Sequence, residues 1–130
     1  MSVIAISKGV KMSPRKVGVV AALIRGRSVN DALVILEHTP RRSALAVKHA
    51  VTSAKANAEH NHSYKPDSLQ ITEITVTPGP RFRRYRAAAR GRALRFARKT
   101  SHIRVVVDGE KRVIKKPVAA KAKSEEKKDD

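Results

Sequence analysis

The stretch of chain from residue 81 to residue 100 constrains the fold more than any other part of the sequence. Its twenty residues include eight Arg, one Lys and no acidic residue, together with three of the chain's four aromatic side chains. A hydrophobic core cannot contain such a stretch, because guanidinium groups are not buried together without anionic partners. We therefore expect these residues to project from the body that the rest of the chain forms.

Two segments of strong β character enclose this basic stretch. The sequence LQITEITVT occupies residues 69–77, and HIRVVVD occupies residues 102–108, with one face made of Ile103, Val105 and Val107. The simplest connection is a β-hairpin whose outer part, about residues 78–101, forms an arm. With roughly ten to twelve residues per leg at about 3.3 Å each, the arm would reach about 35 to 40 Å. The apolar alternation slips between Ile71 and Ile74, which predicts a bulge or bend there.

The chain before these segments begins with a predicted strand and a predicted helix. Val3 to Ile6 form an apolar run that ends in a turn at Gly9. Ser13 and Pro14 predict a helix start, since Ser can cap a free amide and Pro at the first helical position gives up an N–H that has no partner. The helix would end at Gly26, after an apolar face made of Val17, Val20, Ala21 and Ile24.

Two more helices are predicted to follow. Ser28 and Asp31 resemble a capping box, ahead of an apolar face made of Val29, Ala32, Leu33 and Leu36. Thr39 and Pro40 repeat this capping logic for a third helix, whose apolar face consists of Ala44, Val47, Val51, Ala54 and Ala58. That helix would end in the polar residues 59–63. After the last strand, Asp108 and Gly109 predict a turn.

Residues 113–130 are predicted to be a disordered, charged tail. They mix Lys, Ala and acidic residues without an apolar period, and their net charge is only +2. Of the chain's net charge of +18, residues 1–112 therefore carry +16. We expect residues 1–112 to form a single domain that includes the arm.

So large a positive charge predicts a polyanionic partner. A membrane is the weaker candidate, because the longest apolar run, Val19 to Ile24, is short and no export signal is recognisable. The chain has no Cys, which excludes disulfides and thiolate metal sites, and we expect no metal and no other cofactor. A cytoplasmic protein fits these features.

The residue types of the basic stretch are those that bind RNA. Phosphates accept bidentate contacts from Arg, and unpaired bases stack on Phe, Tyr or guanidinium planes. In the arm we expect RNA contacts from Arg81, Phe82, Arg83, Arg84, Tyr85, Arg86, Arg90, Arg92, Arg95, Phe96, Arg98 and Lys99. In the body we expect phosphate contacts, some of them near a helix N-terminus, from Lys8, Lys11, Arg15, Lys16, Arg25 and Arg27.

A DNA-binding architectural protein is the alternative, since charge alone does not separate DNA from RNA. No helix-turn-helix, zinc finger or basic-zipper pattern is visible in the sequence. An isolated arm of Arg and aromatic residues suits irregular, folded RNA better than a regular groove.

Two local patterns suggest chemistry, and each has a simpler explanation. The segment SPRK at 13–16 matches the S-x-x-K pattern of acyl-transferring hydrolases, but the accompanying motifs are absent and a helix start accounts for it. The segment HNH at 60–62 could touch a metal, yet only Glu59 and Asp67 lie nearby. We therefore expect no enzymatic activity. For His102 we expect packing or hydrogen bonding at the base of the hairpin.

The segment RRYRAAARGRALRFARKTSHIRVVV, residues 83–107, resembles the signature of the bacterial large-subunit ribosomal protein family L-twenty-two. The shared pattern is a basic residue, Arg-Gly-Arg-Ala, and then His-Ile followed by alternating Val. The segments SPRK at 13–16, LIRGR at 23–27 and ANAEHN at 56–61 are similar to that family as well. The resemblance covers residues 1 to about 110.

This resemblance implies an α+β fold, with three helices packed on a small three-stranded antiparallel sheet and a long protruding β-hairpin arm. It implies a structural protein of the large ribosomal subunit that binds large-subunit rRNA and neighbouring ribosomal proteins and forms no homo-oligomer. The tip of the arm would line the nascent-peptide exit tunnel and meet the nascent peptide through Arg83, Arg84, Tyr85, Arg86, Ala87, Ala88, Ala89 and Arg90. The chain departs from the family at residues 87–89, where it has Ala-Ala-Ala and family members often carry Pro-Arg-Ala.

Overall fold

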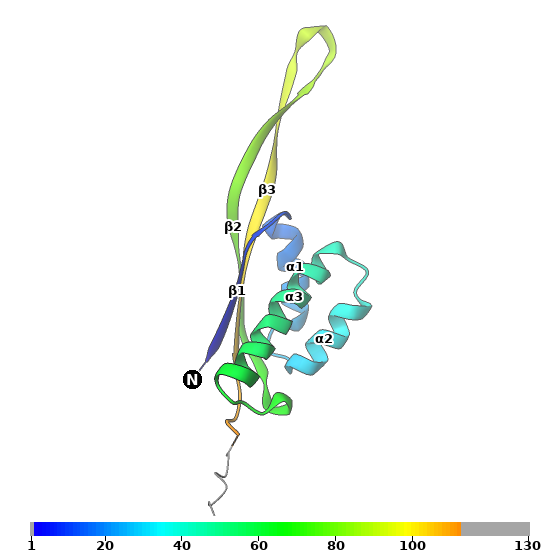
Figure 1. Cartoon of the computed structure of the whole chain (residues 1–130). Helices are drawn as coiled ribbons and strands as arrows, with labels where there is room; N and C mark the ends of the chain where they lie inside the picture. Colours follow the sequence, from blue (N-terminus) through cyan, green and yellow to red (C-terminus); the bar gives the residue numbers. More distant parts are fainter. Residues whose placement is uncertain (1, 113–130) are drawn as a thin grey trace, which may run out of the picture.

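Two long strands run from one end of the molecule to the other, through the helix-covered body and on into the hairpin arm (Figure 1). They are β2, Gln70–Ala87, and β3, Ala93–Asp108. Near the helices they form an antiparallel sheet with β1, Val3–Val10, in the order β1-β3-β2. Beyond the helices β2 and β3 pair only with each other and form the arm. The computed structural model describes residues 2–112, so the tail predicted for residues 113–130 lies outside the described residues.

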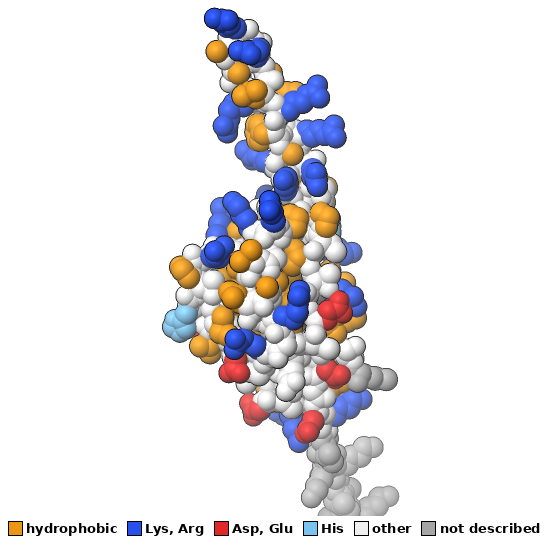
Figure 2. All heavy atoms as spheres, turned by 180° about the vertical axis from the view of Figure 1, so that it is seen from behind, with side chains coloured by type: hydrophobic (Ala, Val, Ile, Leu, Met, Phe, Trp, Pro, Cys, Tyr) orange, Lys and Arg blue, Asp and Glu red, His pale blue; other side chains and the backbone are white. Residues whose placement is uncertain are grey.

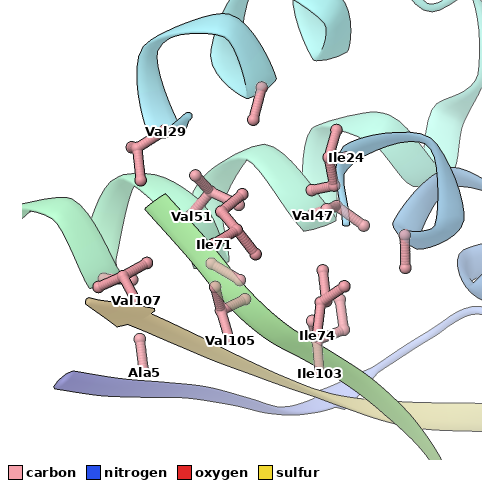
Figure 3. Close-up of a cluster of buried hydrophobic side chains, with 14 of the residues drawn as sticks. Ala5, Ile24, Val29, Val47, Val51, Ile71, Ile74, Ile103, Val105 and Val107 are labelled. Atoms are coloured by element: carbon pink, nitrogen blue, oxygen red, sulfur yellow. The ribbon is translucent and has the colours of Figure 1, made fainter. Parts of the chain in front are cut away.

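Three helices cover one face of the sheet (Figure 1). They are α1, Pro14–Ile24; α2, Val29–His38; and α3, Arg42–Ala56, which continues as a π-helical turn, Asn57–Asn61. The long α3 lies directly over the sheet, where Val47 and Val51 meet Ile71 and Val105 (Figure 3). The predicted α+β fold, with its three helices, three-stranded antiparallel sheet and hairpin arm, is confirmed.

The core is almost wholly aliphatic. Buried side chains come from every helix and strand of the body, and the one aromatic ring among the buried residues that the structure describes is Tyr64. The apolar faces predicted for the helices point into this core, although Leu33 is only partly buried. Such a core needs close packing of small side chains, which is why Ala44, Ala50 and Ala54 lie on the buried face of α3.

The helix starts agree only in part with the capping pattern that the sequence predicts. The Ser28 side chain does cap α2, because its Oγ accepts a hydrogen bond from the Asp31 amide over 3.1 Å. Ser13 precedes α1 as predicted, but its side chain makes no capping hydrogen bond. The start predicted at Thr39 and Pro40 is wrong, since α3 begins at Arg42. The Thr39 hydroxyl donates instead to the carbonyl of Ile35 over 2.6 Å, so Thr39 ends α2.

The strands change register at three places. The shift between Ile71 and Glu73 in β2 confirms the predicted bulge. The second shift, between Pro78 and Arg81 in β2, contains Gly79 and Pro80 and was not predicted. The third, between Ser7 and Val10 in β1, contains Gly9, where the predicted turn is wrong because the strand continues through an irregularity to Val10. These two shifts face each other across β3, because Val10 and Pro78 both pair with Ser101. The body therefore passes into the arm at a point where both neighbours of β3 are irregular.

The turn predicted at Asp108 and Gly109 is wrong. The chain runs on past β3, and Lys111 pairs with Tyr64 in an antiparallel bridge. The reason is the close packing at Gly109, where a Cβ atom would lie 3.1 Å from both the Leu69 side chain and the Ser68 hydroxyl. Glycine is needed here for a close approach of two segments and not for a turn.

Candidate nucleic-acid interface

The arm exposes its side chains, as the sequence predicts. Every residue of β2 from Arg81 to Ala87 and of β3 from Ala93 to Lys99 is exposed. The loop that joins the two strands at the end of the arm consists of residues 88–92, closed by a hydrogen bond from the Ala88 amide to the Arg92 carbonyl over 2.8 Å. Arg90 and Gly91 both have positive φ at the tip, 57° and 69°.

The arm's two faces carry different cross-strand pairs. Because side chains alternate along a strand, one face combines the pairs Phe82–Arg98, Arg84–Phe96 and Arg86–Leu94. The opposite face combines Arg81–Lys99, Arg83–Ala97, Tyr85–Arg95 and Ala87–Ala93. The first face thus combines one basic and one large apolar side chain at every step, whereas the second ranges from a wholly basic pair, Arg81–Lys99, to a pair of small residues, Ala87–Ala93.

Two aromatic rings of the arm lie beneath guanidinium groups. The Arg86 guanidinium carbon is 5.6 Å from the centre of the Phe96 ring, and that of Arg95 is 5.9 Å from the centre of the Tyr85 ring. At these distances the cation–π attraction favours the pairs. Among the described residues, no carboxylate forms an ion pair with an arm guanidinium, because the described ion pairs all lie in the body.

A groove of about 1000 Å³ lies where the arm meets the body. One wall is the segment that leads into α1 together with the first turn of that helix, and another is the start of α3. The third wall is the lower part of the arm. The basic residues that line the groove are Lys11, Lys16, Arg41, Arg42, Arg84, Arg98 and Lys99. No acidic residue lines it within the part of the chain that the structure describes.

Charge is distributed unevenly along the molecule. On the face shown in Figure 2, Lys and Arg side chains follow the arm and continue over the adjoining part of the body, while Asp and Glu gather farther from the arm. Three acidic residues of the body are paired with lysines: Glu37 with Lys48 at 2.6 Å, Glu110 with Lys65 at 3.3 Å and Glu59 with Lys55 at 3.9 Å. The Lys48 ammonium, by its hydrogen bond and its charge, lowers the pKa of the Glu37 carboxyl.

The structure brings some of the predicted RNA contacts together and separates others. Lys11 and Lys16 of the body meet Arg84, Arg98 and Lys99 of the arm in the groove. Arg25 and Arg27 lie at the far end of α1, where the Arg25 guanidinium donates to the Ile74 carbonyl over 3.2 Å and that of Arg27 to the Leu23 carbonyl over 3.0 Å. These two side chains thus help to hold the body together.

The sequence analysis missed one whole wall of the groove, which Arg41, Arg42 and Ser43 form. The signal was present, since two adjacent Arg residues stand just after Thr39 and Pro40. Even the predicted start at Thr39 and Pro40 places both Arg residues in the first turn of the third helix, but only the structure shows that this turn opens into the groove.

Within residues 2–112, no three His, Asp or Glu side chains lie close enough to hold a metal ion together. Across the same residues, no helix has the length and apolar character needed to cross a membrane. A folded α+β body that carries a long, exposed basic arm defines a class of structural proteins suited to a polyanionic partner.

Comparison with known proteins agrees with this class. Residues 5–108 match the family described as ribosomal protein L22p/L17e. The protein named large ribosomal subunit protein uL22 of Clostridium tetani is 48% identical over 103 residues, which is 79% of this chain and 93% of that protein. The protein of the same name from Oceanobacillus iheyensis is 47% identical over 107 residues, 82% of this chain and 95% of that protein. The chain therefore belongs to the ribosomal protein L22p/L17e family, and it is a structural protein and not an enzyme.

Proposed function

We propose that this protein binds large-subunit rRNA through its arm and the adjoining surface of the body. As a member of its family it is a component of the large ribosomal subunit in the cytoplasm. The observation that carries the proposal is the arm itself, whose nine basic residues from Arg81 to Lys99 have no acidic neighbour along the strands and are displayed to a partner. Phosphates are the partners that such side chains favour.

In the proposed function the body and the arm form one domain. A single cluster of buried residues joins all three helices to all three strands, and the strands of the arm are continuous with the strands of that cluster. An arm fixed to a folded body at two strands can enter folded RNA in a defined direction. Neighbouring ribosomal proteins would then meet those parts of the body that RNA leaves uncovered.

The tip of the arm is the proposed contact with the exit tunnel and the nascent peptide. The proposal assigns the tunnel wall to residues 83–90, which include the last exposed pairs of the hairpin and the bend at Arg90. With roughly ten to twelve residues per leg, the arm spans about 35 to 40 Å. Because of this length, the tip can line the exit tunnel while the legs and the body bind the RNA.

Binding measured against salt tests the proposed function. If the protein neutralises Z phosphates, log K should fall by roughly 0.7 to 0.9 Z for each log unit of salt. Large-subunit rRNA should bind more tightly than duplex DNA of equal length, and the native protein should sediment with the large subunit. Equal affinity for the two nucleic acids would favour a DNA-binding architectural protein, and a response that is flat in salt would contradict the proposal.

A further inference from the structure

We propose that the groove between the arm and the body holds a single-stranded turn of RNA, with its phosphates at the starts of α1 and α3 and an unpaired base against Phe82. This inference rests on the proposed function and names the ligand of one part of the interface. It assigns roles to Arg41, Arg42 and Ser43, which belong to neither the arm nor the predicted set of body contacts.

The charge of the groove selects a polyanion. Seven basic side chains from three separate parts of the chain line it, with no carboxylate among the described lining residues. A concave surface with charges of one sign and low-dielectric walls concentrates the electrostatic field inside it. None of these seven residues is engaged in an ion pair between described residues, so their charge is available to a ligand.

The ends of two helices open into the groove. The helices α1 and α3 have 11 and 15 residues, and neither has a side-chain cap or an acidic residue in its first turn. Their first amides and their dipoles therefore favour negative charge. Ser43 adds an observation of a different kind, because it is only 5% exposed, lines the groove and makes no hydrogen bond through its hydroxyl with other described residues. A phosphate oxygen in the groove would accept a hydrogen bond from this hydroxyl.

Phe82 is placed to stack on a base. It lines the groove and is 49% exposed. Tyr85 and Phe96 each have a guanidinium over the ring, whereas among the described residues no guanidinium lies over the ring of Phe82. About half of its surface is therefore accessible, and basic side chains line the same groove. Aromatic rings of this kind stack on bases of single-stranded nucleic acid regardless of sequence.

A base-paired helix does not fit these requirements. In a duplex each base is stacked and paired, so no base face is free for Phe82. Duplex phosphates also follow a regular surface, while the groove presents its cations on three walls around a concave space. A turn or loop of unpaired RNA offers both a free base and phosphates that point in several directions.

The substitution Phe82→Trp provides a direct test, because the chain has no Trp of its own. The full-length variant is titrated with large-subunit rRNA, and then with single-stranded and fully paired RNA oligonucleotides of equal length. We expect the indole emission to be quenched by the rRNA and by the single strand, and much less by the duplex. Val34→Trp is the control, since Val34 is 55% exposed on α2 and does not line the groove. Its emission should stay unchanged.

Charge removal gives a second readout of the same groove. The double change Arg41→Ala, Arg42→Ala should weaken binding to large-subunit rRNA by about tenfold or more, as expected for the loss of charge-assisted phosphate contacts. The matched control, Lys111→Ala with Arg112→Ala, removes the same charge outside the groove and should change affinity by less than about threefold. Phe82→Leu keeps an apolar side chain but no ring, and should weaken binding by about tenfold.

The outcomes separate this inference from the proposed function. Suppose that rRNA binding is tight and salt-dependent, that the Phe82→Trp variant shows no quenching, and that the Arg41 and Arg42 variant equals its control. This result would refute the binding of single-stranded RNA in the groove and leave the proposed function in place. Stronger quenching by the duplex than by the single strand would also refute the proposed binding of single-stranded RNA in the groove. Absence of any binding of the unaltered protein to large-subunit rRNA would overturn both.

Discussion

The amide of Gly9 donates a hydrogen bond to Nδ1 of His102 over 3.0 Å. Gly9 has a φ of 72° and lies within the irregular part of β1, next to the point where β3 leaves the body. The contact joins the edge strand to the strand that carries the arm. It confirms that His102 forms a hydrogen bond at the base of the hairpin.

Replacing His102 with Ala should loosen this junction. The Gly9 amide would lose its acceptor, at a cost of about 0.5 to 1.5 kcal/mol. Amide exchange measured by NMR should become faster at Gly9 and stay unchanged at Gly26, whose amide donates to the Ile71 carbonyl in the body. Equal protection of Gly9 in both proteins would show that the imidazole does not hold the bulge.

Two glycines should respond to alanine in opposite ways. A Cβ at Gly79 would lie 2.6 Å from Thr100 Oγ1 and 3.2 Å from the His102 ring, so Gly79→Ala should destabilise the fold by about 1 to 3 kcal/mol. A Cβ at Gly18 meets nothing within 4 Å on α1, and Gly18→Ala should stabilise by about 1 kcal/mol. Urea unfolding measures both, and the prediction fails if the two changes have the same sign.

Neighbouring hydroxyls at the base of the arm should also differ. Thr100 Oγ1 donates to the Pro80 carbonyl over 2.7 Å, and Thr100→Val should cost about 1 kcal/mol. Ser101 Oγ is buried without a partner among the described residues. Ser101→Ala should therefore cost no stability and could raise the free energy of unfolding by as much as about 3 kcal/mol. Thermal and urea unfolding of both variants provide the comparison. A large loss in Ser101→Ala would mean that this hydroxyl is bound in solution.

The pair formed by Glu37 and Lys48 should give a small pH dependence. Lys48 lowers the pKa of Glu37 in the folded protein below the ordinary value of 4.5. The pair therefore stabilises the fold above pH 4.5, and this contribution is lost as the pH falls through the folded pKa. An NMR titration should show the Glu37 pKa rising toward 4.5 in Lys48→Ala. An unchanged pKa would mean that the contact does not persist in solution.

The tip and the legs of the arm should have separable roles. Deleting residues 88–90 should leave incorporation into the large subunit largely intact, because those residues add few contacts to those of the legs and body. The deletion should alter the action of stalling peptides or small molecules that lodge in the tunnel. Replacing Arg95, Arg98 and Lys99 with Ala should instead weaken incorporation, measured by sedimentation, because phosphate contacts are lost. The reverse pattern would contradict this division.

The sequence was sufficient for those features that depend on local patterns. A period of two residues marks the strands, a period between three and four marks the helices, and a run of Arg without apolar support has to lie outside a core. The slip between Ile71 and Ile74 belongs to the same kind of signal, and the structure has its bulge there. Each of these depends on neighbours along the chain.

Helix starts and turns were harder to predict because several local partners compete for the same group. The Thr39 hydroxyl has the chemistry either to cap the following helix or to donate back to Ile35, and the structure has the second arrangement. Asp108 and Gly109 have the composition of a turn, but Gly109 is required by its contact with Ser68 and Leu69. Such competition is decided by the final position of each segment, which the local sequence does not specify.

The sequence by itself determined that this chain has an α+β body and an exposed basic arm, and its charge predicts a polyanionic partner. Only the tertiary structure decided where the basic residues meet. The groove joins residues near positions 11–16, 41–43 and 82–100, which are far apart in the chain and converge because the starts of α1 and α3 lie beside the base of the arm. Periodicity reports which face of each element is buried, but it carries no information on which ends of different elements lie side by side.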